Sequence, residues 1–164
     1  MIRYQSLDGS GRHNARYFRH KLHQSLPRFL AYCAIMRACR PVPQFRLHKP
    51  VVVGLVLPEG ADMDIYEDAA RYAAHGQAVL NGGSDGTDVL TRTGSRRSNQ
   101  ADDAELAKSL ARKRRVVLLA DSLASVPDNF HLAADAVVEV GPVLARHVIA
   151  GAKLCLNLTV TREQ

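Results

Sequence analysis

Residues 114–121 read Arg-Arg-Val-Val-Leu-Leu-Ala-Asp, and this stretch decides the fold. Two basic residues precede five consecutive apolar residues, and Asp121 follows them. A short, continuous apolar run rich in Val and Leu is typical of a strand that is buried on both faces inside a parallel sheet. The segments on both sides have helical patterns, so the sequence predicts an α/β fold.

Other apolar runs extend the predicted sheet in both directions along the chain. The runs at 51–57 (VVVGLVL) and 136–140 (AVVEV) are strong strand candidates, and residues 77–81 form a shorter one. We therefore expect a small three-layer α/β fold. Its mostly parallel sheet has three or four strands, and an N-terminal helical arm joins it.

The segments between these strands are predicted to be helices, with one long loop. A helix starts at Asn14 and restarts at Pro27, and residues 41–49 are a linker. Asp64 is predicted to open a helix that Gly76 ends, and acidic residues 102–105 open the next one. A short helical turn covers 127–134, and a helix after 141–142 ends at Gly151. The polar residues 82–100 are expected to form a long surface loop.

Charge divides the 164 residues into a basic arm and a weakly acidic remainder. The net charge is +6, but residues 1–50 hold ten Lys and Arg against the single acid Asp8, which leaves +9 there. We divide the chain into a basic arm and linker (1–49), an α/β domain (50–151) and a C-terminal segment (152–164). The arm is expected either to be a solvated leader or to bind nucleic acid, an anionic membrane surface or an acidic partner.

The cysteines and the hydropathy pattern exclude several classes of protein. Cys33, Cys39 and Cys155 are odd in number and lack a CxxC spacing, which argues against a disulfide framework and a zinc site. No apolar run approaches the ~20 residues that span a bilayer. The first residues also lack a secretory h-region. A cytoplasmic protein is the expectation, with an Arg-rich mitochondrial leader as the alternative.

No complete nucleotide-binding motif is found. The loop at 82–94 contains Gly82 and Gly83 but matches neither GxxxxGK[ST] nor GxGxxG. Asp121 follows an apolar strand as a Mg²⁺-binding aspartate does in P-loop ATPases. Without a phosphate-binding partner motif, a helix cap at Asp121 and Ser122 is the favoured interpretation. Asp121, Gly82 and Gly83 are thus the nearest candidates for binding a cofactor, and no cofactor is predicted.

Catalytic and metal-binding constellations are missing from the pattern as well. His20 and His23 lie three residues apart near His13, but no third ligand is identified, so solvated helix positions are favoured. There is no GxSxG nucleophile motif. The basic run 112–115 fits a helix end that complements the dipole. No catalytic residue and no metal ligand are predicted.

The last residues have a capping-box pattern with no helix behind it. Thr161-Arg162-Glu163-Gln164 has the form S/T-x-x-E/Q. It indicates either an open reading frame that stops early or a domain cut from a longer protein, and the alternative is a chance match to a loose four-residue pattern. Before it, Leu154, Leu156 and Leu158 alternate with polar residues, as in a strand. We expect the segment 152–160 to be an exposed edge through which the chain associates with itself, and the alternative is that it pairs with the sheet of its own chain.

Several of these segments together resemble the region that precedes the ATPase core in bacterial AAA-type ATPases. The similar parts are residues 49–53 (KPVVV), the helix at 64–74, the run 114–121, the step 133–138 (AADAVV) and the exit 158–164. The resemblance covers most of residues 14–164. It implies a helical leader and a small α/β module without the motor's own motifs, which would lie beyond residue 164.

Three functions follow as hypotheses. The resemblance implies a non-catalytic adaptor or regulatory module, or a truncated fragment, of an AAA-type ATPase, with the ATPase core or other subunits as partners. The alternative is a small Rossmann-like nucleotide-binding protein or hydrolase that uses Asp121 and the loop 82–94. The second alternative is nucleic-acid binding by the basic arm, where Tyr4, Tyr17, Phe18 and Phe29 could stack on bases.

Overall fold

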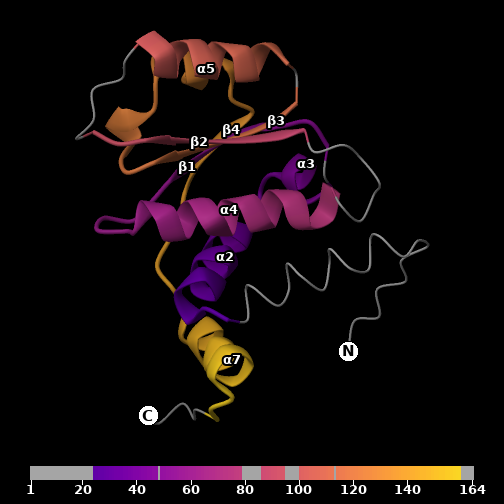
Figure 1. Cartoon of the computed structure of the whole chain (residues 1–164), viewed down its shortest axis with the longest axis vertical. Helices are drawn as coiled ribbons and strands as arrows, with labels where there is room; N and C mark the ends of the chain where they lie inside the picture. The colour runs from indigo at the N-terminus through magenta and orange to yellow at the C-terminus, as the bar shows by residue number, and fades with distance from the viewer. Residues whose placement is uncertain (1–23, 48, 79–85, 95–99, 113, 160–164) are drawn as a thin grey trace.

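The computed structural model describes residues 24–47, 49–78, 86–94, 100–112 and 114–159. It contains a four-stranded sheet in the order β2-β3-β1-β4, in which all neighbouring strands are parallel (Figure 1). Helices lie on both faces of this sheet (Figure 1). The predicted α/β fold is therefore confirmed.

The strands are β1 (Val52–Val56), β2 (Thr87–Arg92), β3 (Arg115–Ala120) and β4 (Ala136–Glu139). Val52 of β1 lies opposite Val116 of β3, and Val53 lies opposite Ala136 of β4. Every residue of β3 is buried. The apolar run 116–120 thus belongs to an internal strand, and its continuous apolar character follows from burial on both faces.

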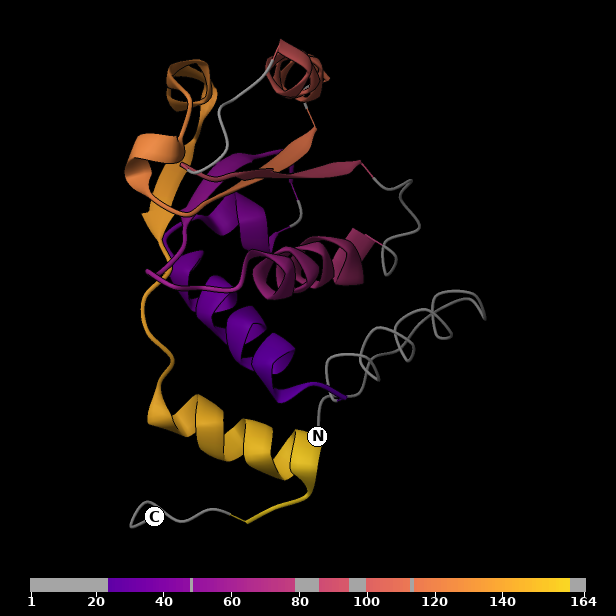
Figure 2. The ribbon, with the colours of Figure 1, turned by 60° about the vertical axis from the view of Figure 1, so that its left-hand side comes forward.

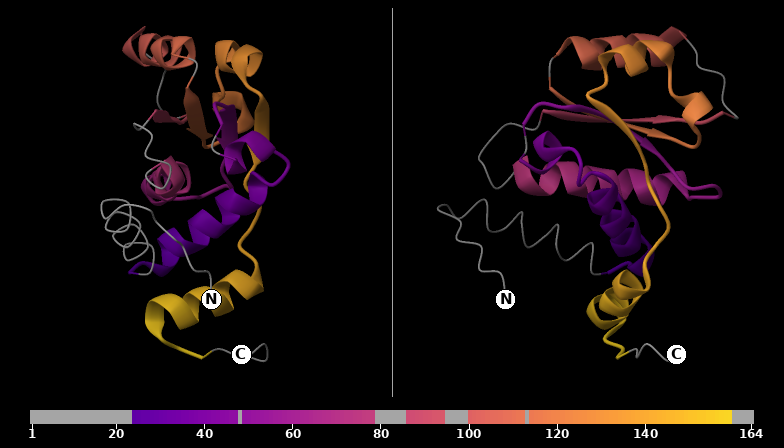
Figure 3. Two further views of the ribbon diagram at one scale, coloured as in Figure 1. Left: turned by 90° about the vertical axis from the view of Figure 1, so that its right-hand side faces the viewer. Right: turned by 180° about the vertical axis from the view of Figure 1, so that it is seen from behind.

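Three layers result from the way the helices are divided between the two faces. Helices α2 (Leu26–Ala38), α3 (Pro43–Arg46) and α4 (Met63–Ala78) cover one face. Helices α5 (Gln100–Ala111) and α6 (Asp128–Ala133), with the short 3-10 turn η2 (Leu123–Ser125), cover the other (Figure 2). Helix α7 (Ala145–Leu156) packs on α2, away from the sheet (Figure 3).

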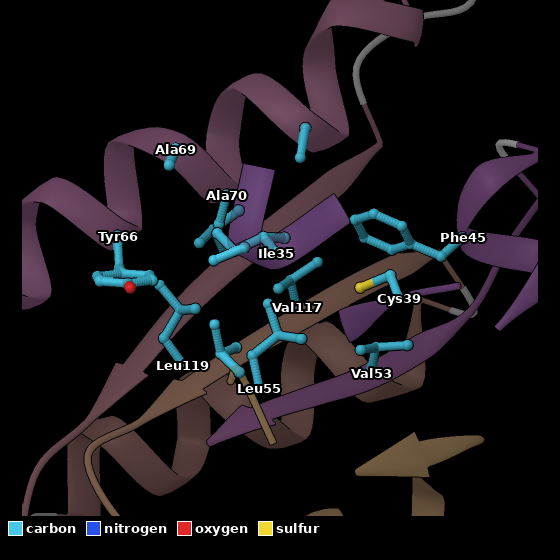
Figure 4. Close-up of a cluster of buried hydrophobic side chains, with 14 of the residues drawn as sticks. Ile35, Cys39, Phe45, Val53, Leu55, Tyr66, Ala69, Ala70, Val117 and Leu119 are labelled. Carbon is cyan, nitrogen blue, oxygen red and sulfur yellow. The ribbon is translucent and has the colours of Figure 1, made fainter. Parts of the chain in front are cut away.

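Alternate residues of the central strands supply the two halves of the core. Val117 and Leu119 of β3 face α2 and α4, where they meet Ile35 and Phe45 in the larger cluster (Figure 4). Val116, Leu118 and Ala120 belong to the cluster on the opposite face, together with Leu106 and Phe130. A single strand therefore contributes to both halves of the aliphatic core.

The second strand of the chain lies at a different position from the predicted one. Residues 77–81 were expected to be a strand, but Gln77 and Ala78 belong to α4, and 79–81 lie outside the described residues. The actual strand β2 lies within 82–100, the segment assigned to a surface loop. Only Val89 and Leu90 of β2 are buried, because β2 is an edge strand, and a two-residue apolar signal resembles a loop.

Helix boundaries also differ from the predictions in detail. The restart near Pro27 is confirmed, since Ser25 caps α2 and Pro27 lies in its first turn. The predicted linker 41–49 contains α3, whose Phe45 is buried. The cap of α4 is Asp62 rather than Asp64, because Asp62 Oδ1 accepts the backbone N–H of Asp64 and of Ile65 at 3.1 and 3.2 Å. Gly76 does not end α4.

Residues 152–156 belong to helix α7, so the predicted period-two strand is wrong over this part of the segment. Helix α7 starts at Ala145, passes through Gly151 and ends at Leu156, with Asn157 in the left-handed conformation. The alternation of Leu154, Leu156 and Leu158 was coincidental. The capping-box residues 161–164 and the arm residues 1–23 lie outside the described residues. Among the described helices, none is long and apolar enough to cross a membrane.

Candidate functional site

The carboxyl edge of the sheet is where parallel α/β folds bind ligands, at the point where neighbouring strands send their connections to opposite faces. Here that point lies between β1, which leads to α4, and β3, which leads to η2 and α6. The Leu57 N–H donates to the Ala120 carbonyl at 2.8 Å and holds the two strand ends together. Asp121 follows directly after Ala120 and so occupies this position.

Both carboxylate oxygens of Asp121 accept hydrogen bonds from the protein. Oδ2 accepts the backbone N–H of Gly94 at 2.8 Å, and Oδ1 accepts the hydroxyls of Ser125 and Ser122, the latter at 3.3 Å. The two hydroxyls also lie 2.8 Å apart. The Ser125 hydrogen bond, followed by those of Gly94 and Ser122, lowers the pKa of Asp121, so this exposed group is a carboxylate at neutral pH.

The favoured cap interpretation of Asp121 is wrong in its details. Ser122 occupies the cap position of η2, but its hydroxyl bonds the Ser125 hydroxyl rather than a backbone N–H of the turn. Asp121 likewise accepts the Ser125 hydroxyl instead of a backbone N–H of that turn. Through Gly94, Asp121 also joins the exit of β3 to the exit of β2. Its first role is thus to fix two neighbouring loops at the carboxyl edge.

The other cofactor candidates do not join Asp121 in the described structure. Gly82 and Gly83 lie outside the described residues. Gly86 immediately precedes β2, so it lies at the amino edge of the sheet, opposite to Asp121. Among the described residues of the loop 82–94, Gly94 contacts Asp121 at the carboxyl edge. Sequence reasoning found Asp121 but not Gly94, since no local pattern links residues that are so far apart.

Metal-binding groups of at least three His, Cys, Asp or Glu side chains do not occur among the described residues. The predicted histidine group cannot be placed, because His13, His20 and His23 all lie outside this part of the chain. Cys33, Cys39 and Cys155, all within the described residues, form no disulfide.

The basic run 112–115 does not behave as a uniformly solvated helix end. Arg115 is buried, donates from Nη1 to the Ala74 carbonyl at 3.1 Å and lies 5.8 Å from the centre of the Phe45 ring. Burial lowers the pKa of its guanidinium. Arg112 pairs with Asp88 at 3.8 Å. Both residues therefore have structural roles that the run itself did not indicate.

A second basic group, missed by sequence reasoning, surrounds the first turn of α7. Arg37 of α2 donates from Nη2 to the Pro142 carbonyl. Partial burial, and then the charges of Arg146, Arg37 and Arg40, lower the pKa of His147. The sequence placed Arg37 and Arg40 at a helix end, but nothing in it showed that α7 would return beside them.

Two adjoining pockets line the outer edge of β2. They have volumes of about 270 and 230 Å³ and share Val89, Leu90 and Glu105 as lining residues. Lys108 and Ser109 of α5, with Arg112 just after it, line the first, and Arg92 and Asp102 line the second. The hollow therefore follows the edge strand beneath α5, away from Asp121.

Helix α7 leaves apolar side chains exposed on both sides of its contact with α2. Gly151 and Ala152 are buried in that contact. Leu154 and Leu156 are 48% and 51% exposed, and Val148 and Leu158 are exposed as well. We call these four residues the α7 apolar surface.

The described part of the basic arm is engaged with the rest of the fold. Arg28 pairs with Asp68 of α4 at 2.7 Å. Phe29 approaches Gly151 of α7 and is only partly exposed, so it packs between helices rather than standing free for base stacking. Tyr4, Tyr17 and Phe18 lie outside the described residues.

Comparison of the chain with protein-family models, with curated proteins and with solved structures yields no match.

Proposed function

We propose that this chain is a non-catalytic adaptor or regulatory module of an AAA-type ATPase, acting through protein–protein contacts. The observation that carries the proposal is the α7 apolar surface. Val148, Leu154 and Leu156 of α7, with Leu158 just after the helix, leave apolar side chains exposed on an outlying element, and such surfaces are candidates for protein contacts. The resemblance described above supplies the class of partner, an AAA-type ATPase core.

The hydrogen bonds that Asp121 accepts from its own loops also support a non-catalytic role for this chain. A carboxylate that accepts hydrogen bonds from its own loops has a structural role at the carboxyl edge, and that role requires no catalysis. Here Oδ1 and Oδ2 accept hydrogen bonds from Ser125, Ser122 and Gly94, which hold the loops in place. The turn after β1 adds Pro58, Glu59 and Gly60, which supply no positive charge for a phosphate.

The test begins with the DNA downstream of the codon for Gln164. A P-loop ATPase core encoded there, in frame or after a frameshift, would be produced separately and titrated with this chain by calorimetry. We expect binding that weakens at least tenfold in the double variant Leu154→Lys/Leu156→Lys. Leu132→Lys is the matched control, because Leu132 is 91% exposed but lies on α6. Equal affinity of the wild type, the double variant and Leu132→Lys for the ATPase core would show that the α7 apolar surface is not the binding site.

The nucleotide-binding alternative is favoured by one observation, the position of Asp121 at the switch point of the sheet. Titration of the purified chain with ATP, GTP and NAD separates it from the leading proposal. We expect no binding heat and no ATP hydrolysis by this chain alone. Saturable binding of any of the three that Asp121→Ala abolishes would establish the alternative instead.

A further inference from the structure

Strand β2 ends the sheet on one side. Among the described residues it pairs with β3 only, and the two pockets above follow its other edge. An uncovered edge offers unpaired backbone N–H and C=O groups that can accept another strand. The question is which strand fits this edge.

The hydrogen bonds to β3 show which groups of β2 point outward. The Asp121 N–H donates to the Arg92 carbonyl at 3.2 Å, so the backbone groups of Arg92 face β3. Backbone groups alternate in direction along a strand. Those of Leu90 and Asp88 therefore also face β3, and those of Val89 and Thr91 face outward. The outward Thr91 carbonyl accepts Arg92 Nη1 at 2.8 Å and keeps a second lone pair for a partner strand.

Two opposite charges are placed symmetrically about Leu90 on one face of β2. Asp88 lies two residues before Leu90 and Arg92 two residues after it, both on the side of α5. There Asp88 pairs with Arg112, and Arg92 Nη2 donates to the Asp102 carbonyl at 2.7 Å. Within the described structure, Asp88 Oδ2 and Arg92 Nε have no hydrogen-bond partner. Both atoms are buried, so the edge offers a partner the opposite charges of Asp88 and Arg92 rather than free hydrogen-bonding groups.

Helix α5 repeats this symmetry above the strand. Its side over the pockets is acidic at the beginning, with Asp102 and Glu105, and basic at the end, with Lys108 and then Arg112. The acidic end lies over Arg92 and the basic end over Asp88, so α5 runs opposite to β2. A two-fold axis through Leu90 would bring each acidic end beside the basic end of the other copy.

We propose that a second copy of this chain occupies the β2 edge, with the two β2 strands antiparallel and Leu90 opposite Leu90. In this register Val89 and Thr91 of opposite copies form hydrogen-bonded pairs with their outward groups. Asp88 and Arg92 face each other in non-hydrogen-bonded pairs, where side chains approach most closely. The contact is isologous and closes as a dimer with one eight-stranded sheet. It is independent of the α7 apolar surface and of the proposed function.

Charge reversal followed by mixing tests this register. In Asp88→Arg and in Arg92→Asp, each self-pair would place like charges opposite each other. A mixture of the two variants restores opposite charges at both positions of a heterodimer. In sedimentation velocity runs over a concentration series, we expect the wild type to dimerise and each variant to have a dissociation constant at least about tenfold higher. The equimolar mixture should recover the dimer, and high salt should weaken all charge-dependent association.

A backbone variant gives an independent arm, because Arg92 also supports its own protomer. Thr91→Pro removes an outward N–H and blocks strand addition without removing a bond to β3. Glu139→Pro is the control on β4, at the opposite edge of the sheet. Circular dichroism and thermal unfolding would establish that each variant is folded. We expect Thr91→Pro to abolish the dimer and Glu139→Pro to leave it.

The outcomes separate this proposal from other modes of association. A wild-type chain that is monomeric at every concentration overturns it. So does a dimer that Thr91→Pro and both charge reversals leave intact, or one that only Leu156→Lys disrupts. Failure of two folded charge variants to associate on mixing excludes the proposed register.

Discussion

The Asp121 carboxylate and the Gly94 backbone N–H, separated by 27 residues in sequence, are joined at 2.8 Å. This hydrogen bond links the loop after β3 to the loop after the edge strand β2. Gly94 approaches closely, since a Cβ there would lie 3.3 Å from the hydroxyl oxygen of Ser125. The carboxyl edge on the β2 side therefore depends on one acidic side chain.

Replacing this carboxylate should destabilise the fold in a pH-dependent way. Asp121→Ala leaves the Gly94 N–H and the Ser125 hydroxyl without their acceptor, which we expect to lower the free energy of unfolding by about 1–2 kcal/mol at pH 7. The folded pKa of Asp121 is lowered from its usual value of 3.8. The stabilisation is thus fully present above that value and is lost as the pH falls through the folded pKa.

Urea unfolding at several pH values measures this difference. Glu59→Ala is the control, because Glu59 is an exposed acid after β1 at the same edge. A deficit for Asp121→Ala that stays constant down to pH 2, or one no larger than that of Glu59→Ala, would show that the hydrogen bonds do not stabilise the fold.

The contact between α7 and α2 should not tolerate a side chain at Gly151. A Cβ there would lie 2.5 Å from Leu26 Cδ1 and 2.9 Å from Phe29 Cδ1. Alanine favours a helix by about 1 kcal/mol over glycine. We nevertheless expect Gly151→Ala to cause a net loss of about 1 kcal/mol through overpacking. Thermal unfolding of Gly151→Ala, Leu26→Ala and the double variant forms a cycle. Relief of the clash predicts that the double variant loses less than the sum of the two.

Two neighbouring apolar residues of α6 should respond very differently to truncation. Phe130 is fully buried between α6 and the sheet, whereas Leu132 is 91% exposed. We expect Phe130→Ala to cost about 3–5 kcal/mol in chemical denaturation. Leu132→Ala should stay within about 0.5 kcal/mol of the wild type. Similar values for the two variants would mean that α6 is not packed as described.

The thiols should differ in reactivity according to burial. Burial raises the pKa of Cys39 to about 12, and it also raises the pKa of the partly exposed Cys33 and Cys155. Alkylation requires the thiolate. We expect iodoacetamide at pH 8 to modify Cys33 and Cys155 slowly and Cys39 not at all in the folded chain. Peptide mass spectrometry locates the label, and all three should react in urea. Rapid labelling of Cys39 in the native protein would contradict its buried position.

The sequence predicted those parts of the fold in which burial and local pattern agree. The runs around β1 and β3 are apolar because both faces of these strands are covered, and a continuous apolar run needs no partner to be recognised. Strand β2 was not predicted because Val89 and Leu90 are its only apolar residues, and two apolar residues do not distinguish a strand from a loop. Helix α7 was partly mistaken for a strand because apolar residues flank its contact with α2 on both sides, which imitates alternation.

The candidate site was predictable only to the extent that it is local. Asp121 could be found because it directly follows a buried strand. The roles of its partners could not, since Gly94 and Asp121 meet only after β2 and β3 pair. The symmetric charges of the β2 edge could not be predicted either, because they depend on the fold. Asp88 and Arg92 acquire a common face only once their segment is known to be a strand.

The strand order also affects how the chain folds during its synthesis on the ribosome. Strand β1 is made first but lies between β3 and β4, which are made last. At roughly 5–20 residues per second, the stretch of about 60 residues from Val52 to Val116 takes about 3–12 s to synthesise. During that interval the nascent β1 has neither lateral neighbour and its apolar side chains remain available to chaperones. Newly made chains therefore pass through a stage in which the apolar strand β1 has been synthesised but cannot yet pair with β3 or β4.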